Sequence, residues 1–322
     1  MCTETKICFA SSSLSVGRMA CNHLDKEALT LALWVGIFRL ENCNFVVDMV
    51  SKEGFVLHVG GRLWTLAEPV VMGIVNVTPD SFYAASRTET EGALRQRVRR
   101  VLSEGGAVVD VGACSTRPHS KPASVDEEME RLRFALPIIK SESGGAVVSV
   151  DTFRADVARM AVEEYGVDLI NDVAGGEEEM FRSVAQLHVP YVLTYRGAGP
   201  ALGPAGALVK LGKQVQKLHD LGVADIILDP GFGFDKDVEE NYRLLRELDV
   251  LDELGLPILV GVSRKRMIYE LLGVGADEAL NGTTAVHVLA LLKSDNVKIL
   301  RVHDVREAVE AIKIVKAYND SI

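Results

Sequence analysis

The chain has 322 residues, of which 48% are hydrophobic and 6% aromatic, and its 45 acidic and 35 basic residues give a formal net charge of −10. The apolar fraction excludes a disordered chain, and the length fits one large or two ordinary domains. Because a net negative charge repels phosphate groups and anionic lipids, the composition argues against a nucleic-acid or membrane-surface partner.

The first 50 residues differ in composition from the rest. Four of the five cysteines fall here, no CxxC pair occurs, and the apolar run at 28–40 is too short to span a bilayer. These features favour reduced thiols and a cytoplasmic location over secretion. We expect residues 1–50 to be an extension that is disordered or not part of the native protein, with Met49 as an alternative start, and residues 51–322 to form one domain.

A β-hairpin is predicted immediately after this extension. Residues 54–66 alternate in polarity around the pair Gly60 and Gly61, which is a strong hairpin signal. Such a hairpin could cover the amino-terminal mouth of a barrel.

Past residue 70, eight short apolar runs alternate with longer segments of helical spacing. Continuous apolar runs are typical of parallel strands buried on both faces. Eight strand–helix units in about 250 residues predict an α/β fold, the (β/α)8 TIM barrel. A doubly wound open sheet is the alternative, but no glycine-rich phosphate turn follows the first strand. The predicted strands are 70–76, 107–111, 146–151, 168–171, 191–194, 225–229, 257–262 and 297–302, and the clearest helices are 90–103, 125–140, 154–164 and 239–254.

Polar side chains lie at the carboxyl end of nearly every predicted strand. In a barrel these ends meet at one mouth, where catalytic residues gather. A single aspartate there could instead cap the helix that follows, but seven such strand ends together indicate a site. The residues are Asn76, Asp110, the segment 115–118, Asp151, Asn171, Asp172, Asp229, Ser263, Arg264, Lys265, Arg301, His303 and Asp304.

These residues divide by chemistry into two groups. One supplies carboxylates and an amide, which pair with the nitrogen-rich edge of a flat heterocycle. The other supplies positive donors for anionic oxygens, and Asn76 offers its amide oxygen to Mg2+ or its NH2 group to phosphate. The pattern predicts a heterocycle joined to a phosphate or pyrophosphate leaving group, bound in a locally basic cleft. The first group is Asp110, Asp151, Asn171 and Asp229, and the second is Arg117, Lys265, Arg301 and His303.

Seven motifs, in order and spacing, resemble those of the dihydropteroate synthase family of folate biosynthesis. The resemblance covers about residues 55–318. It implies a (β/α)8 barrel, in agreement with the strand count. The motifs are VMGIVNVTPDSF (71–82), VDVGACSTRP (109–118), SVDTF (149–153), INDVAGG (170–176), LDPGFGF (228–234), VGVSRK (260–265) and RVHDV (301–305).

The resemblance implies a transferase that condenses 6-hydroxymethyl-7,8-dihydropterin pyrophosphate with p-aminobenzoate, giving 7,8-dihydropteroate and pyrophosphate. Mg2+ and the basic cluster would neutralise the departing pyrophosphate before the amine attacks. The implied partners are these small molecules and a second copy of the chain, in a homodimer formed through the late barrel helices.

The resemblance also assigns roles to individual residues. The implied catalytic residues are Asn76, Arg117, Lys265, Arg301 and His303. Those for the pterin are Asp110, Asp151, Asn171, Asp229 and Lys265. Those for p-aminobenzoate are Thr116, Arg117, Pro118, Phe234 and Ser263. Pyrophosphate would be held by Asn76, Arg301 and His303, and the metal by Asn76.

Three loops depart from the family pattern. Residues 83–87 read YAASR, without the expected acidic group, and Cys114 stands where a glutamate is expected. The fifth strand ends in LTYRG (193–197) instead of a Met-His-Met pattern, before a Gly/Pro/Ala-rich loop that reaches Gly206. We interpret Cys114 as a small buried hydrophobe rather than a reactive thiol. The departures bear on substrate fit, turnover and sulfonamide sensitivity.

Two alternatives follow from these departures and from the shared fold. The first is a divergent, non-catalytic pterin-binding paralogue. The second is a pterin-dependent methyltransferase domain, which would have no need for the STRP, SRK and RVHD segments together.

Overall fold

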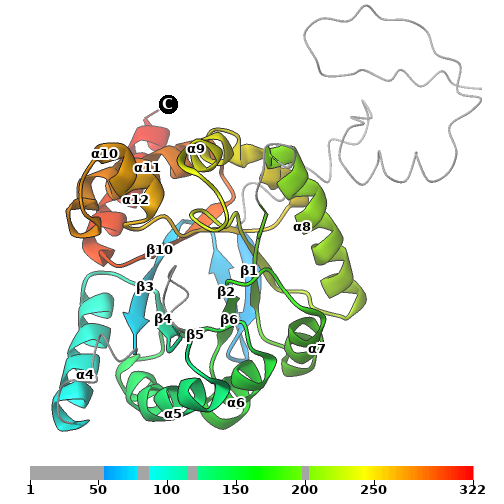
Figure 1. Ribbon diagram of the computed structural model, residues 1–322, viewed down its shortest axis with the longest axis vertical. Coiled ribbons are helices and arrows are strands. Elements are labelled where there is room, and N and C mark those ends of the chain that lie inside the picture. Colours follow the sequence, from blue (N-terminus) through cyan, green and yellow to red (C-terminus); the bar gives the residue numbers. More distant parts are fainter. Residues whose placement is uncertain (1–53, 78–86, 115–121, 198–202, 322) are drawn as a thin grey trace, which may run out of the picture. The chain divides into compact units, whose positions relative to one another are not determined.

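The computed structural model describes residues 54–77, 87–114, 122–197 and 203–321. Within these ranges, eight parallel strands close into a barrel, with the helices around it (Figure 1). Closure through β10 and β3 confirms the predicted (β/α)8 barrel and excludes the doubly wound sheet, whose edges stay open. The barrel strands are β3 (Val70–Asn76), β4 (Val108–Gly112), β5 (Val147–Asp151), β6 (Leu169–Asp172), β7 (Tyr191–Thr194), β8 (Ile226–Asp229), β9 (Ile258–Val260) and β10 (Val297–Val302).

The helices follow the strands as predicted, with one difference. The segment expected to form a single helix over 239–254 divides at Glu247, whose φ of −117° and ψ of 28° lie outside the helical region. The second part is a 3-10 helix that buries Leu248 and Leu251, because residues three apart share a face at that pitch. The helices are α4 (Arg87–Ser103), α5 (Val125–Glu142), α6 (Ala155–Tyr165), α7 (Glu178–Leu187), α8 (Gly203–Asp220), α9 (Val238–Arg246), η1 (Leu248–Leu254), α10 (Arg266–Leu272), η2 (Ala276–Glu278), α11 (Leu280–Lys293) and α12 (Val305–Asp320).

The predicted hairpin is present as β1 (Phe55–Val59) and β2 (Arg62–Leu66), paired antiparallel. Its turn residues Gly60 and Gly61 have φ values of +54° and +74°. A two-residue turn that matches the twist of the strands needs positive φ at both positions, which glycine adopts without a steric penalty.

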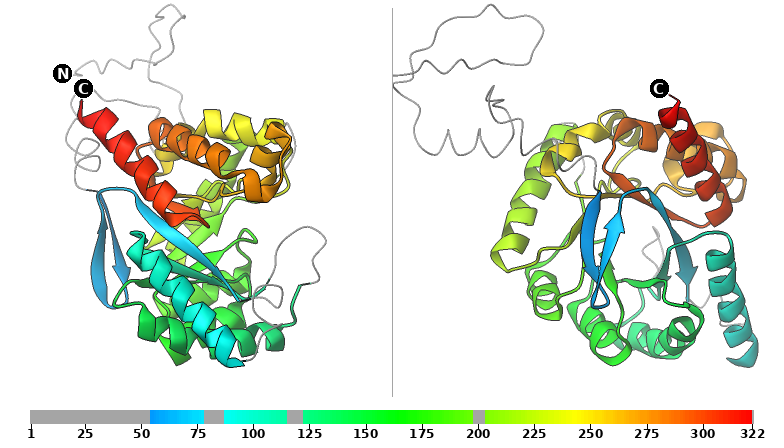
Figure 2. Two further views of the ribbon diagram at one scale, coloured as in Figure 1. Left: turned by 90° about the vertical axis from the view of Figure 1, so that its left-hand side faces the viewer. Right: turned by 180° about the vertical axis from the view of Figure 1, so that it is seen from behind.

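The hairpin closes the amino-terminal end of the barrel (Figure 2). Leu57, Val59 and Leu66 pack against one interior side chain from each barrel strand, and all are almost fully buried. Burial of each such side chain is worth about 1.5–3 kcal/mol, so the layer holds the hairpin firmly. The polar residues of the sequence motifs therefore lie toward the opposite, carboxyl end of the strands. The strand side chains are Met72, Val108, Val147, Leu169, Val192, Ile227, Leu259 and Ile299.

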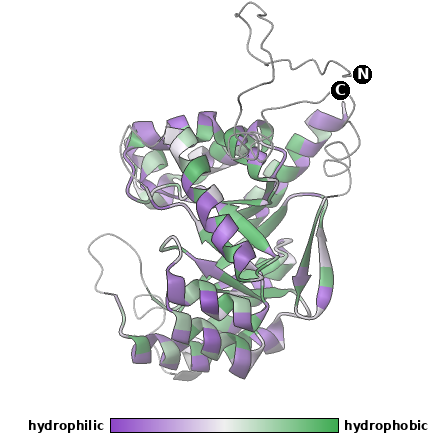
Figure 3. Cartoon of the chain, turned by 90° about the vertical axis from the view of Figure 1, so that its right-hand side faces the viewer, coloured by the Kyte–Doolittle hydropathy of each residue, from purple (hydrophilic) through white to green (hydrophobic). Residues whose placement is uncertain are grey.

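A second apolar layer fills the space between the barrel and its helices. Figure 3 shows the strands as largely hydrophobic and the helices as banded, with polar residues on the faces turned away from the barrel. In the part of the chain that the structure describes, no helix is long and apolar enough to cross a membrane. The predicted domain boundary at residue 50 stays a prediction, because residues 1–53 lie outside the described ranges.

Candidate active site

An ion-paired triad lies at the centre of the barrel mouth. Arg301 on β10 donates from Nε to Asp110 Oδ2 on β4 at 2.6 Å, and from Nη2 to Asp151 Oδ2 at the end of β5. Asp110 is fully buried, while Arg301 and Asp151 keep about 15% of their side-chain surface exposed. Because these strands lie around one barrel, the three groups meet only by pointing inward. The triad thus joins Arg301, which was predicted to bind pyrophosphate, to Asp110 and Asp151, which were predicted to bind the pterin.

Two oxygens in and beside this triad lack a hydrogen-bond partner within the described part of the chain. Asn171 on β6 donates from Nδ2 to Asp110 Oδ2 at 3.2 Å, but its own Oδ1 is unpaired, as is Asp110 Oδ1. Thr194 Oγ1, at the end of β7, is a third buried polar atom without a partner among the described residues. Leaving a buried polar group unpaired costs about 1–3 kcal/mol. A ligand that brings N–H donors into the mouth would remove that cost.

Asp229 and Lys265 form the second charged element of the mouth. Asp229 Oδ1 accepts from the backbone N–H of Gly231 at 2.8 Å. Its other oxygen and Lys265 Nζ both lie about 4 Å from the position that a Cβ on Gly261 would take. Lys265 Nζ also donates to the backbone oxygen of Phe232. The backbone at Gly261, just past the end of β9, thus runs beside the acid and the amine without a side chain between them.

Burial sets the protonation of these groups close to neutral pH. It raises the pKa of Asp151 to about 7; Arg301 opposes that rise and Asp110 supports it. It lowers the pKa of Lys265 to about 8, against the attraction of Asp229. Burial opposes the charge of Arg301 too, but Asp110 and Asp151 raise its pKa above the usual value. Groups poised near pH 7 in a cleft are typical of active sites.

The locally basic cleft expected from the sequence stays a prediction. Among the described residues, the carboxylates of Asp110, Asp151 and Asp229 are accompanied by three cations, on Arg301, Lys265 and Lys236. Of the further cations in that prediction, His303 is held neutral by burial and by Arg301, which lower its pKa to about 4. The other is Arg117, which lies outside the described residues.

His303 and Ser263 hold each other at the ends of β10 and β9. His303 Nδ1 lies 3.0 Å from Ser263 Oγ, which also accepts from the His303 backbone N–H at 3.1 Å. Arg97 on α4 donates to the His303 backbone oxygen at 2.8 Å. Ser263 therefore orients the imidazole, and Arg97 holds the backbone that carries it.

Asn76 ends β3 beside the neighbouring strand. A Cβ on Gly112 would lie 3.3 Å from Asn76 Oδ1 and 3.9 Å from Asp151 Oδ2, so glycine leaves both side chains room over β4. No group of three or more His, Cys, Asp or Glu residues that could hold a metal occurs in the described ranges.

The Phe234 ring is in contact with two cationic side chains. Lys265 Nζ is 4.5 Å and Arg196 Cζ is 4.8 Å from its ring centroid. The other residues predicted for the same subsite fall partly outside the description. Ser263 is described above, whereas Thr116, Arg117 and Pro118 belong to 115–121 and, like the divergent loop at 83–86, lie outside the described residues.

Three residues of the mouth were not predicted as site residues. Arg196 follows β7 and pairs with Asp235, and Lys236 is buried with Nζ 2.9 Å from the Gly231 backbone oxygen. Burial lowers the pKa of Lys236 to about 8. Only their positions in the sequence could have indicated a role in the site, because Arg196, Asp235 and Lys236 lie in or directly after segments that follow strand ends.

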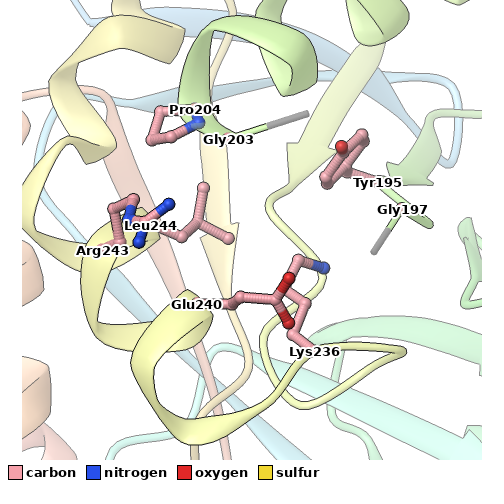
Figure 4. A pocket seen from close by; sticks show the side chains of 8 residues that line it. All are labelled: Tyr195, Gly197, Gly203, Pro204, Lys236, Glu240, Arg243 and Leu244. Carbon is pink, nitrogen blue, oxygen red and sulfur yellow. The ribbon is translucent and has the colours of Figure 1, made fainter. Parts of the chain in front are cut away.

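Lys236 also faces a small pocket of about 30 Å³ beside α9 (Figure 4). In Figure 4 the Lys236 and Glu240 side chains lie on one side of this space and the Tyr195 ring on another. The pocket shares no lining residue with the triad or with the Asp229–Lys265 element.

Two strand-end aspartates have structural partners. Asp172 Oδ2 accepts from the buried Tyr191 hydroxyl at 2.6 Å, and its Oδ1 accepts from the Ala174 N–H. Asp304 occupies the N-cap position of α12 but makes no side-chain cap bond, and instead pairs with Arg264 through two contacts of 2.7 and 3.0 Å. Neither aspartate caps the helix that follows it, which was the alternative role considered for a single aspartate at a strand end.

Cys114 follows β4 and is half-buried and free. Burial raises the pKa of its thiol, which keeps it protonated at neutral pH. This agrees with a packing role in place of the family's glutamate.

Comparison with known proteins places these observations in one family. Residues 72–303 match the model of the pterin binding enzyme family. The chain is 34% identical over 278 residues to the dihydropteroate synthase of Escherichia coli K12, covering 81% of this chain and 95% of that one. It is also 34% identical over 301 residues to the folate synthesis bifunctional protein of Arabidopsis thaliana, covering 84% of this chain but only 62% of that protein's length.

A solved structure agrees with both matches. A Xanthomonas albilineans dihydropteroate synthase with 4-aminobenzoic acid superposes with a TM-score of 0.74 and 36% identity, over 82% of this chain and 98% of that one.

Proposed function

The chain belongs to the pterin-binding enzymes and, within them, to the dihydropteroate synthases, and we propose that the barrel mouth described above is its active site. The reaction joins 6-hydroxymethyl-7,8-dihydropterin pyrophosphate to p-aminobenzoate in folate synthesis. The observation that carries the site assignment is the buried polar layer, in which Asp110 and Asn171 each hold an unpaired acceptor beside the Arg301 triad.

The pterin is the ligand that this layer fits. Its ring edges carry N–H and NH2 donors, which the free oxygens of Asp110 and Asn171 and the carboxylates of Asp151 and Asp229 accept. Lys265, beside Asp229, donates to a ring acceptor. Because most of these acceptors are buried, a ring without matching donors would leave them unpaired and bind poorly.

Pyrophosphate and p-aminobenzoate occupy the rest of the mouth in this proposal. Arg301 and His303 donate to the leaving group, and Thr116 and Arg117 are assigned to p-aminobenzoate. Phe234 and Ser263 line the aromatic subsite with Pro118. The methylene–oxygen bond breaks as pyrophosphate leaves, the amine nitrogen forms the new carbon–nitrogen bond, and a proton leaves that nitrogen. Arg301 stabilises the charge that develops on the departing oxygens.

Mg2+ fits this site as a metal carried mainly by the substrate. Mg2+ usually keeps several waters and binds through one or two protein oxygens together with substrate phosphates. The Asn76 amide oxygen at the end of β3 is such a ligand. When bound, the ion would neutralise charge on the pyrophosphate.

Formation of dihydropteroate from the two substrates tests the function. We expect product only with Mg2+ and none with excess EDTA. Asn76→Ala should raise the Mg2+ concentration for half-maximal rate by roughly 10-fold, because one ligand is lost. Calorimetry of Mg2+-dependent pyrophosphate binding gives the same comparison without turnover.

Pterin binding without product at high enzyme concentration would favour the non-catalytic paralogue, and methyl transfer from a methylated folate would favour the methyltransferase.

A homodimer through the late helices is part of the proposal. Leu289 and Leu292 on α11, and Ile314 and Tyr318 on α12, are each about half or more exposed. Each pair lies three or four residues apart, so it shares one helix face. A cytoplasmic location also stays a proposal, and its support is the cysteine pattern of the sequence.

We expect the double substitution Leu289→Glu with Ile314→Glu to convert the dimer to a monomer, because charges would be buried at the interface. Light scattering coupled to size-exclusion chromatography measures the mass. Val209→Glu, at a similarly exposed position on α8, is the control and should leave the dimer intact. A monomeric parent protein at micromolar concentration would contradict the assignment.

A further inference from the structure

Arg196 and Asp235 form a bidentate ion pair between two loops at the barrel mouth. Arg196 Nε and Nη2 donate to the two Asp235 oxygens at 2.6 and 3.0 Å. Arg196 follows β7, and Asp235 lies in the loop between β8 and α9. Both side chains are only partly exposed, at 33% and 43%. Two parallel bonds of this kind fix the plane of the guanidinium as well as its place.

The pair is tied to a third loop and to one aromatic ring. Arg196 Nη1 donates to the Val173 backbone oxygen at 3.1 Å, beyond the end of β6. The Arg196 stem packs so closely on Gly175 that a Cβ there would lie 2.8 Å from Arg196 Cγ. Its guanidinium then lies over the Phe234 ring, with Cζ 4.8 Å from the centroid. Asp235 therefore holds the Arg196 guanidinium against the ring of Phe234, the residue that precedes Asp235 in the chain.

The backbone at Asp235 is strained for a residue with a side chain. Its φ is +54°, a conformation that glycine adopts freely and most other residues avoid. Aspartate tolerates this region better than most, but it still carries a cost that the surrounding contacts must offset. The carboxylate is the group that gains from the arrangement, since the neighbouring Arg196 lowers its pKa.

We propose that Arg196 and Asp235 act together as positioning residues for p-aminobenzoate, by holding the Phe234 ring as a wall of its subsite. The inference rests on the proposed role of Phe234 in that subsite. Asp235 and the Val173 backbone oxygen together accept bonds from all three guanidinium nitrogens of Arg196, so Arg196 serves the aromatic ring and is not the receptor for the substrate carboxylate. The pair thus sets the affinity for the amine substrate and leaves the pterin layer unchanged.

Steady-state kinetics of three variants test the proposal. Arg196→Met, Asp235→Asn and the double variant should each raise the KM for p-aminobenzoate by about 5-fold, the effect of losing one oriented cation–ring contact. The kcat and the KM for the pterin pyrophosphate should stay within about twofold of the parent. Because the two residues act as one unit, the double variant should be no worse than either single variant.

Lys293→Met is the matched control. Lys293 pairs with Asp249 at 2.7 Å with similar exposure, 35% and 48%, but joins α11 to η1. It should leave both KM values unchanged. Asp235→Gly provides a second comparison, because glycine relieves the positive φ while removing the carboxylate. It should raise the KM for p-aminobenzoate as Asp235→Asn does, even where its melting temperature is higher.

Two results would overturn the proposal. A lower KM for p-aminobenzoate in Asp235→Asn would show that the freed Arg196 binds the substrate carboxylate. Equal changes in both KM values that follow the melting temperature would show a role in loop stability alone. Calorimetric binding of p-aminobenzoate in the presence of a pterin without pyrophosphate gives the same comparison without turnover. A parent enzyme that binds both ligands but forms no product would refute the proposed function and leave this inference to be decided by the binding data.

Discussion

Asp151→Ala should reduce pterin affinity by about 100-fold or more, because a mostly buried ring edge would lose a charged acceptor and its donors would stay unpaired. The carboxylate belongs to the triad with Arg301 and Asp110, so its removal also leaves one guanidinium arm without a partner. Isothermal calorimetry with the pterin substrate measures the loss. Asp156→Ala, an exposed aspartate on α6, is the control and should bind normally.

The same residue predicts a pH dependence of binding. The pKa of Asp151 is raised to about 7, so the ionised acceptor forms as the pH rises through that value, and pterin affinity should rise with it. The folded chain takes up this proton more readily than the unfolded chain, so the associated stability is present at acidic pH and is lost as the pH rises through about 7. Asp151→Asn, which is neutral at every pH, should fold well, bind weakly and show neither trend. Tight pterin binding by that variant would remove Asp151 from the pterin site.

Arg301→Met should lower the free energy of unfolding by about 3–5 kcal/mol and reduce the turnover rate by about 1000-fold. The stability loss arises because two carboxylates, on Asp110 and Asp151, would face each other in a buried layer without their shared cation. The rate loss arises because the departing pyrophosphate would lose its charged donor. Urea unfolding and the dihydropteroate assay measure the two effects separately.

A triple variant separates charge balance from catalysis. Adding Asp110→Asn and Asp151→Asn to Arg301→Met removes the unpaired carboxylates, so stability should return while activity stays lost. Lys298→Met on the same strand donates only to the Ala67 backbone oxygen and serves as the control. Parent-level activity in the triple variant would exclude Arg301 from the reaction.

Much of this fold follows from local patterns in the sequence. The strand Val70–Asn76 has the bounds predicted from the sequence, and the Gly60–Gly61 turn has the backbone that its residue types predict. No local pattern predicts the division of the helix at Glu247, because the sequence there contains neither glycine nor proline. The 3-10 pitch of η1 comes from burying Leu248 and Leu251 against the rest of the core.

The site shows the same division between local and tertiary information. The rule that polar strand ends meet at one mouth located Asp110, Asp151 and Arg301 before their contacts were known. It could not distinguish Asp172, whose carboxylate is bound by Tyr191 on the next strand. The positions of Arg196 and Asp235 after strand-end motifs did not predict that they pair, because the pair depends on two loops meeting 39 residues apart and on a positive φ at a residue that is not glycine.

The apolar layer beneath the hairpin closes the amino-terminal end of the barrel and leaves the carboxyl end as its one mouth. Leu57, Val59 and Leu66 fill the amino-terminal end, so neither substrates nor products pass through the strands. With the active site proposed at the carboxyl end, both reactants arrive and both products depart on that side. The pterin and the amine leave together through this opening, because the new carbon–nitrogen bond joins them, and pyrophosphate is the product that departs separately.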